Sequence, residues 1–258
     1  MSHVIGILAV GLLGALVTAG LVVVWHRYRP VGDGEENGGG DVAEYMSMMI
    51  ALLYALLLGL ALVSVWELRG AAESHTSTEA GALHQITVLA EGMPKAQQAR
   101  IEDVAGRYAG HVVRDEWPHL SEGTPLAEPG WSLVRQLRAV AAAPPDATPS
   151  QEVTALELLG QLSTLDEARR GREAVAQESL SPVLWAGLIV GAVLSICMLF
   201  FFGIGRSPSQ LVMAMGMVGL TVFLGLLIHH LAAPFGEVMG VVPDPFTRYF
   251  PRAAEAGG

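Results

Sequence analysis

Cysteine and lysine are almost missing from this 258-residue chain, and their scarcity excludes several kinds of function. Cys197 is the single cysteine, so the chain can form neither an intrachain disulfide nor a zinc site built on cysteines. Lys95 is the single lysine, and the formal net charge is −10. Nucleic-acid binding requires clustered basic side chains, so this charge argues against DNA or RNA as a partner.

The common sequence signatures of enzymes are also missing. The chain contains no H-E-x-x-H, no G-x-S-x-G, no phosphate-binding loop with a following Lys-Ser/Thr, and no G-x-G-x-x-G. The glycine-rich stretch at residues 31–44 has no strand before it and is typical of a flexible linker. We therefore expect no enzymatic activity, no cofactor and no metal site.

Long apolar runs dominate the composition, which is 52% hydrophobic. Four runs of about 20 residues contain no Asp, Glu, Lys or Arg, and this is the length that a helix needs to cross a bilayer. They predict transmembrane helices over about 4–25, 45–66, 183–205 and 211–231. The first run has no basic residue before it, so we interpret it as a retained anchor rather than a signal peptide. Gly187 and Gly191 in the third run predict close packing against another helix.

The 116 residues from 67 to 182 predict a helical domain outside the membrane. They carry 17 acidic and 10 basic residues. One helix is predicted to end at Trp117-Pro118, because proline cannot continue the hydrogen-bond ladder. Thr148, Pro149 and Gln151 form a predicted capping box for a second helix, in which leucines and a valine recur every three residues from Val153 to Leu165.

The predicted fold is therefore an all-α integral membrane protein with four transmembrane helices and a helical domain between the second and third. Its parts are a first transmembrane pair (1–66), the extramembrane domain (67–182), a second pair (183–232) and a C-terminal tail (233–258). Arg27, Arg29 and Arg206 lie in the two short connections, which favours a cytoplasmic location for these connections and an extracytoplasmic domain.

The helix over the second run shows no strong stop signal at Trp66-Glu67, so we expect it to continue into the domain. At 100° per residue, Trp66, Glu73, Ser77 and His84 then fall near one line, and Glu67 lies one residue away. Extended into the membrane, the same line meets Ala55 and Gly59. One interpretation is a face lining a water-filled path. The other is a packing face whose polar part is solvated, with Trp66 at the membrane interface.

Two adjacent histidines, His229 and His230, end the fourth run. Adjacent helical residues point about 100° apart, so the pair cannot chelate one metal ion on a regular helix. The histidines are either protonatable groups with a function at the membrane edge or interfacial residues at the helix C-terminus.

Several separated blocks resemble the bestrophin-like domain family of bacterial membrane proteins. They contain ALLYALLLGLALVSVWE and the following E-A-x-A-L, RYAGHVVRDEWPHL, LSPVLWAGLIVGAVLSICMLFFFG and LAAPFGEVMGVVPDPF. The residues that match the family motifs are Tyr54, Glu79, Glu116, Trp117, Pro118, Trp185, Pro234 and Phe235. The resemblance implies kinship to bestrophins, which are oligomeric anion channels, but it implies no catalytic residues.

Two hypotheses for the function follow. In the first, the protein is a homo-oligomeric ion channel or pore in the cell membrane, lined by the second span and its extension. The acidic domain would favour cations near the mouth, whereas the kinship implies anions. In the second, the protein is a non-conducting sensor or scaffold, and its 67–182 domain binds a protein partner.

Overall fold

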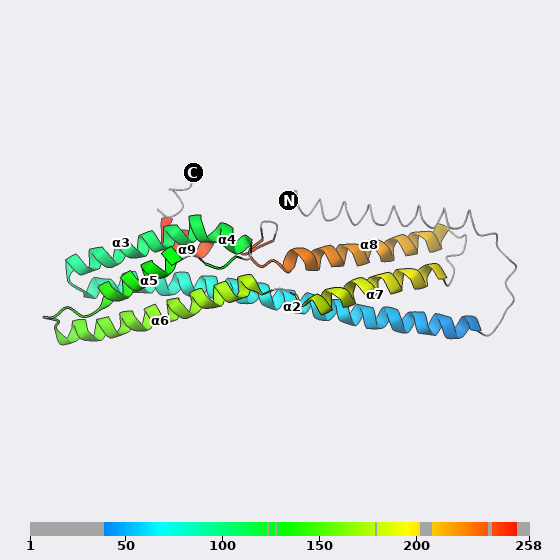
Figure 1. The fold of residues 1–258 in the computed structure, drawn as a ribbon, viewed down its shortest axis with the longest axis horizontal. Helices are drawn as coiled ribbons and strands as arrows, with labels where there is room; N and C mark the ends of the chain where they lie inside the picture. Colours follow the sequence, from blue (N-terminus) through cyan, green and yellow to red (C-terminus); the bar gives the residue numbers. More distant parts are fainter. Residues whose placement is uncertain are drawn as a thin grey trace. The chain divides into compact units, whose positions relative to one another are not determined.

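The structure is a computed structural model that describes residues 39–122, 124–126, 128–178, 180–201, 208–236 and 239–251. These residues form helices joined by short connections and contain no strand, which confirms the all-α class (Figure 1). The helices in chain order are α2 (Gly39–Leu89), η1 (Ala90–Gly92), α3 (Lys95–His111), the π-helical turn η2 (Val112–Glu116), α4 (Trp117–Ser121), α5 (Glu128–Ala141), α6 (Pro149–Gln177), α7 (Pro182–Phe201), α8 (Pro208–Leu231) and α9 (Asp244–Tyr249).

Two of the described helices, Tyr45–Gly92 and Val212–Leu231, are long and apolar enough to cross a membrane. The number of such helices rises to three if the bent pair Pro149–Gln177 and Pro182–Met198 forms one span. The predicted span at 4–25 lies outside the described residues. A total of four spans therefore stays a prediction, whereas the helices over 45–66 and 211–231 are present.

The helix α2 runs without a break through Trp66-Glu67, as the sequence predicts. Its 51 residues contain no proline, so no backbone donor is missing along its length. At about 1.5 Å per residue, the part after Trp66 alone extends about 35 Å. The helix therefore belongs to both of the units into which the chain divides.

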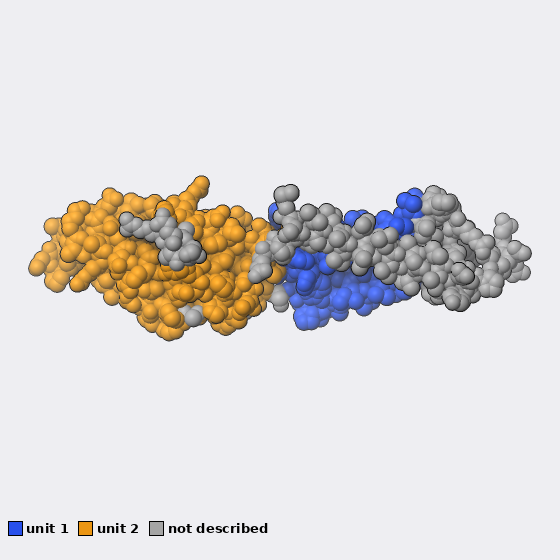
Figure 2. Space-filling model, turned by 90° about the horizontal axis from the view of Figure 1, so that it is seen from above, with its two compact units in different colours: residues 1–66, 180–232 blue, residues 67–179, 233–258 orange. Residues whose placement is uncertain are grey.

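The two units are Met1–Trp66 with Leu180–Ala232 (unit 1), and Glu67–Ser179 with Ala233–Gly258 (unit 2) (Figure 2). In unit 1, α7 packs on α8 and on the first half of α2. A Cβ added at Gly187 would lie 3.4 Å from Leu57, and one at Gly191 would collide with the Tyr54 ring. These two glycines are thus sites of close helix packing, as their spacing predicts.

Unit 2 has its core between the second half of α2 and helices α3, α5 and α6, filled by leucine, isoleucine, valine and alanine. The capping box at the start of α6 is present: Gln151 N–H donates to Thr148 Oγ1, and Thr148 N–H donates to Gln151 Oε1 at 2.9 Å. Phe246 of α9 is fully buried in the same core. The segment 233–258, predicted as a C-terminal tail, thus contributes to this core.

Two details of the helical pattern differ from the prediction. Pro118 does not end the helix, because the π-helical turn η2 places it in the first turn of α4, where its missing N–H costs nothing. On α6, the apolar row does not share one face. On a helix, residues that are three positions apart point in directions that differ by about 60°. The row therefore winds around α6, so Leu162 and Leu165 are buried while Val153 and Leu156 are 57% and 69% exposed.

Candidate functional site

Four charged side chains are buried together in unit 2. They are Glu79 of α2, Glu116 of η2, and Arg169 and Arg172 of α6, and none is more than 1% exposed. Two carboxylates balance two guanidinium groups, so the cluster has no net charge. Burial of an unpaired charge is strongly unfavourable, so each buried charge of the cluster depends on an oppositely charged neighbour.

Arg172 joins the two carboxylates. Its Nε donates to Glu79 Oε2 at 2.6 Å, and its Nη2 donates to Glu79 Oε1 and to Glu116 Oε2, both at 2.9 Å. Arg169 binds the second carboxylate through both terminal nitrogens, at 2.9 Å and 2.5 Å from the Glu116 oxygens. Both arginines thus make forked, charge-assisted bonds, the strongest class of side-chain hydrogen bond.

Tyr108 and His111 of α3 complete the cluster. The Tyr108 hydroxyl donates to Glu79 Oε1 at 2.5 Å and accepts from Arg169 Nη1 at 3.1 Å. His111 Nε2 lies 3.3 Å from Glu116 Oε1, and His111 Nδ1 lies 2.7 Å from Asp115 Oδ2. Helices α2, α3 and α6 and the turn η2 are therefore linked by one network, which we call the ion cluster.

The ion cluster sets the protonation of its members. Burial raises the pKa of the Glu116 carboxyl, but hydrogen bonds from His111 and Arg169 and the charge of Arg172 outweigh burial and hold this pKa well below its usual range. The hydrogen bond to Glu116 raises the pKa of His111, although burial opposes it. Burial and the Glu79 carboxylate raise the pKa of Tyr108, so its hydroxyl stays protonated.

Aromatic rings and a glycine shape the space around the arginines. The Trp131 ring centroid lies 4.6 Å from Arg169 Cζ, and the Trp117 centroid lies 5.8 Å from Arg172 Cζ, so both rings face guanidinium groups. A Cβ added at Gly130 would collide with Arg169 and Glu116. Because the carboxylates are already bonded to arginines, this arrangement is suited to holding helices in register rather than to transferring protons.

The ion cluster contains residues that sequence reasoning singled out only as motif matches, and others that it missed. Glu79 and Glu116 were among the motif residues, and Tyr108 belongs to the matching block RYAGHVVRDEWPHL. Arg169 and Arg172 were not predicted. A signal was present: the two arginines continue the buried positions Leu158, Leu162 and Leu165 of α6 at helical spacing. A charged residue at a core position predicts a buried partner.

The other motif residues lie in both units. In unit 2, the Trp117 ring meets the Phe235 ring edge-on at 5.5 Å, Pro118 lies in the first turn of α4, and the Pro234 carbonyl accepts from Val241 N–H at 2.8 Å. In unit 1, Tyr54 is buried against Gly191, and Trp185 meets His229 edge-on at 5.8 Å.

The predicted polar face of α2 is largely uncovered. Trp66 is 66% exposed, and Glu67, Glu73 and Ser77 are exposed as well. On the same line, Ala55 and Gly59 are exposed. His84 is not part of this uncovered face, because its ring stacks on Tyr249 at 4.5 Å with an interplanar angle of 8°.

The adjacent histidines at the end of α8 make their contacts within unit 1. His230 Nδ1 lies 2.8 Å from the Leu226 carbonyl, which is one turn back on the same helix, and His229 contacts Trp185. Across the described part of the chain, no group of three or more His, Cys, Asp or Glu side chains is arranged to hold a metal ion.

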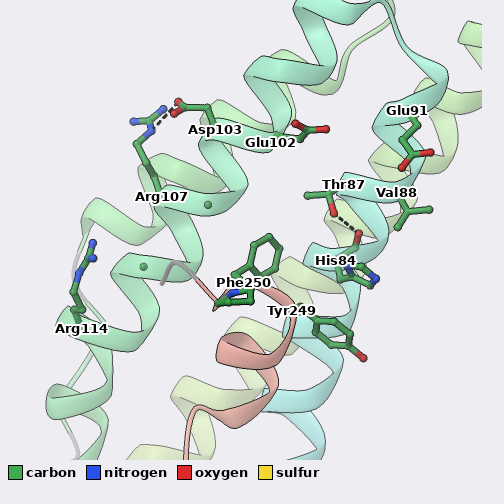
Figure 3. Close-up of a pocket in the computed structure, with 13 residues that line it drawn as sticks. His84, Thr87, Val88, Glu91, Glu102, Asp103, Arg107, Arg114, Tyr249 and Phe250 are labelled. Atoms are coloured by element: carbon green, nitrogen blue, oxygen red, sulfur yellow. Dashed lines mark hydrogen bonds and ion pairs between the residues drawn. The ribbon is translucent and has the colours of Figure 1, made fainter. Parts of the chain in front are cut away.

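A groove in unit 2 runs between α2 and α3 (Figure 3). Its volume is about 870 Å³. His84, Thr87, Val88 and Glu91 line one wall, and the opposite wall carries Glu102, Asp103, Gly106, Arg107, Gly110 and Arg114 of α3 and η2. Tyr249, Phe250 and Pro251 from the C-terminal segment also line it.

The sequence matches the model of the Bestrophin-like domain over residues 14–246. The chain belongs to the Bestrophin-like domain family. This confirms the resemblance inferred from the motif residues, and the match covers both units and every member of the ion cluster.

Solved structures share the fold of this bestrophin-like chain. Two mutants of a bacterial Bestrophin homolog from Klebsiella pneumoniae align with TM-scores of 0.69 and 0.67, at 14% and 13% identity. The alignments cover 97% and 99% of this chain and 98% and 99% of the homolog chains. A mutant of a membrane protein aligns over 100% of both chains, with a TM-score of 0.66 at 14% identity. No curated protein matches. At these identities, the likeness concerns the fold alone.

Proposed function

We propose that this bestrophin-like protein is a homo-oligomeric ion channel in the cell membrane, and that the uncovered face of α2 lines its ion path. The observation that carries the proposal is the exposure of this face in the protomer. Ala55, Gly59, Trp66, Glu73 and Ser77 follow one line on a single helix, and no described part of the chain covers them. A ring of protomers with this line inward has a pore walled by α2.

The residues on the line suit that role. Ala55 and Gly59 are small, so neighbouring copies of α2 can approach each other or leave a narrow path between them. Beyond them, Glu73 lies on the line and Glu67 points about 100° to its side, and each recurs once per protomer around a ring. Rings of carboxylates raise the local concentration of cations, so the mouth favours cation entry. Measurement of reversal potentials under an ion gradient distinguishes cation permeation from anion permeation.

Flux from liposomes tests the proposal. Purified protein is reconstituted, and the release of cations and of anions is measured for the wild type, Glu67→Gln and Glu73→Gln. Glu122→Gln is the matched control, because Glu122 is an exposed acid that lies outside α2. We expect the α2 variants to change the rate or the ion selectivity and the control to behave as the wild type. Release no faster than from empty liposomes, under every gradient and pH, would refute a channel.

We further propose that the chain crosses the membrane four times, with the 67–182 domain on the extracytoplasmic side. Arg27, Arg29 and Arg206 support this orientation through the excess of basic residues expected in cytoplasmic connections. In a Cys197→Ser background, Glu91→Cys should react in intact cells with a maleimide that cannot cross membranes. Reaction only after the cells are opened would reverse the orientation and leave the flux measurement unaffected.

A further inference from the structure

The short helix α9 lies against the same line of α2 that the proposed ion path follows. His84 continues this line, and its ring stacks on Tyr249 of α9 with the centroids 4.5 Å apart (Figure 3). Two turns earlier on the line, Ser77 borders a cavity of about 490 Å³. The other residues that line this cavity all belong to α9: Asp244, Pro245, Thr247, Arg248 and Tyr249. Beyond Ser77, the surface along the line is therefore made by α9 as well as by α2.

Two phenylalanines hold α9 in place on unit 2. Phe246 is fully buried in the core, and Phe250 packs against that core. The backbone is fixed as well, because Phe246 N–H donates to the Pro243 carbonyl at 3.0 Å and Phe250 N–H donates to the Phe246 carbonyl at 2.8 Å. The helix is thus an integral part of unit 2, and the direction of its side chains is defined by the burial of Phe246.

Two charged side chains of α9 point away from the core. Asp244 and Arg248 lie two residues before and two residues after Phe246, so at 100° per residue each points about 160° away from it. Both are exposed. Neither side chain has a hydrogen bond or an ion pair to another residue in the described part of the chain. One carboxylate and one guanidinium are therefore free to act on ions in the space that Ser77 borders.

We infer that α9 forms the wall of the ion path beyond Ser77, and that Arg248 and Asp244 determine ion selectivity there with opposite effects. The inference rests on the proposed channel and adds residues that were predicted to lie in a C-terminal tail. In a ring with the α2 line inward, every protomer contributes one Arg248 and one Asp244 at this level. Arg248 raises the local concentration of anions, and Asp244 raises that of cations.

The charges of α9 act in series with the carboxylates of α2. Ser77 lies four residues past Glu73, which is about 6 Å farther along the helix. An anion that Glu73 repels is attracted at Arg248, so these two levels of the path act with opposite sign. A unit charge about 10 Å away in water changes the local concentration of a monovalent ion about twofold, and a ring of copies increases this effect.

Reversal potentials under a potassium chloride gradient test the inference on the reconstituted full-length protein. Arg248→Gln should raise the ratio of cation to anion permeability at least about twofold, and Asp244→Asn should lower it by a similar factor. Arg138→Gln is the matched control, because Arg138 is an exposed arginine of unit 2 that lies on α5, and it should leave the ratio unchanged. All three side chains are exposed, so the variants should unfold at the wild-type temperature.

Chemical modification provides a second test at the same position. In a Cys197→Ser background, Arg248→Cys is treated with a negatively or a positively charged methanethiosulfonate. The two reagents should shift the permeability ratio in opposite directions, whereas Arg138→Cys should respond to neither. A conducting protein whose permeability ratio is the same in all α9 variants would overturn the inference and leave the channel standing. Absence of flux from every protein, the wild type included, would refute the channel and this inference with it.

Discussion

The ion cluster leads to a sharp prediction about stability. Arg172→Met keeps an unbranched side chain of similar length but removes the guanidinium that bonds both Glu79 and Glu116. Glu116 keeps Arg169, whereas Glu79 keeps only the Tyr108 hydroxyl and becomes a buried, unpaired carboxylate. Removal of one member of a buried ion pair costs about 3–5 kcal/mol of the free energy of unfolding. For a unit of this size, the midpoint of thermal unfolding should fall by about 15 °C.

The measurement is thermal unfolding of the detergent-solubilised protein, followed by tryptophan fluorescence, since Trp117 and Trp131 face the cluster. Arg170→Met is the matched control on the same helix. Arg170 is 68% exposed and pairs with Asp166 at the surface, so its loss should cost no more than about 1 kcal/mol.

A double variant shows whether the cost arises from unbalanced charge. Glu79→Gln combined with Arg172→Met restores neutrality, because the Glu116–Arg169 pair remains. We expect the double variant to be more stable than Arg172→Met alone, although it carries one more substitution. The reasoning fails if Arg172→Met unfolds within about 3 °C of Arg170→Met, or if the double variant is the least stable of the three.

Other predictions concern pH and packing in unit 2. The lowered pKa of Glu116 means that its contribution to stability is complete above its unfolded value near 4.5 and is lost as pH falls toward the folded value. The wild-type unfolding temperature should therefore drop more than that of Glu116→Gln on acidification from about pH 5 to about pH 3; equal drops would contradict this assignment. The raised pKa of His111 acts in the opposite direction. Its contribution to the free energy of unfolding is complete below about pH 6.5 and is lost as the pH rises through the folded pKa. Raising the pH from about 6 to about 9 should therefore lower the unfolding temperature of the wild type more than that of His111→Gln. Gly130→Ala should destabilise unit 2 strongly, because its Cβ would meet Arg169 and Glu116, whereas Gly81→Ala, with nothing within 4 Å, should gain up to about 1 kcal/mol from helix propensity; similar unfolding temperatures for the two alanine variants would contradict this packing.

The composition and periodicity of the sequence determined the class of the molecule. Apolar runs of bilayer length predict membrane helices, and the absence of a proline between Trp66 and Leu89 predicts that the second helix continues past Trp66-Glu67, as α2 does. The capping box at Thr148 predicts the start of α6, because its partners are three residues apart and need no tertiary contact. The motif residues were enough to identify the family.

Only the tertiary structure decided which charged residues matter to the core. Glu79, Glu116, Arg169 and Arg172 lie up to 93 residues apart in the chain, and no local pattern brings them together. The charges balance only when all four groups are buried together. This depends on the register between α2, η2 and α6, which places the two carboxylates beside the two guanidinium groups. Likewise, the apolar spacing on α6 could not show that Leu162 is buried while Leu156 is exposed, since burial depends on which neighbouring helices cover each side. The sequence determines which side chains lie on each face of a helix. Which of these faces is buried depends on the helices that pack against it.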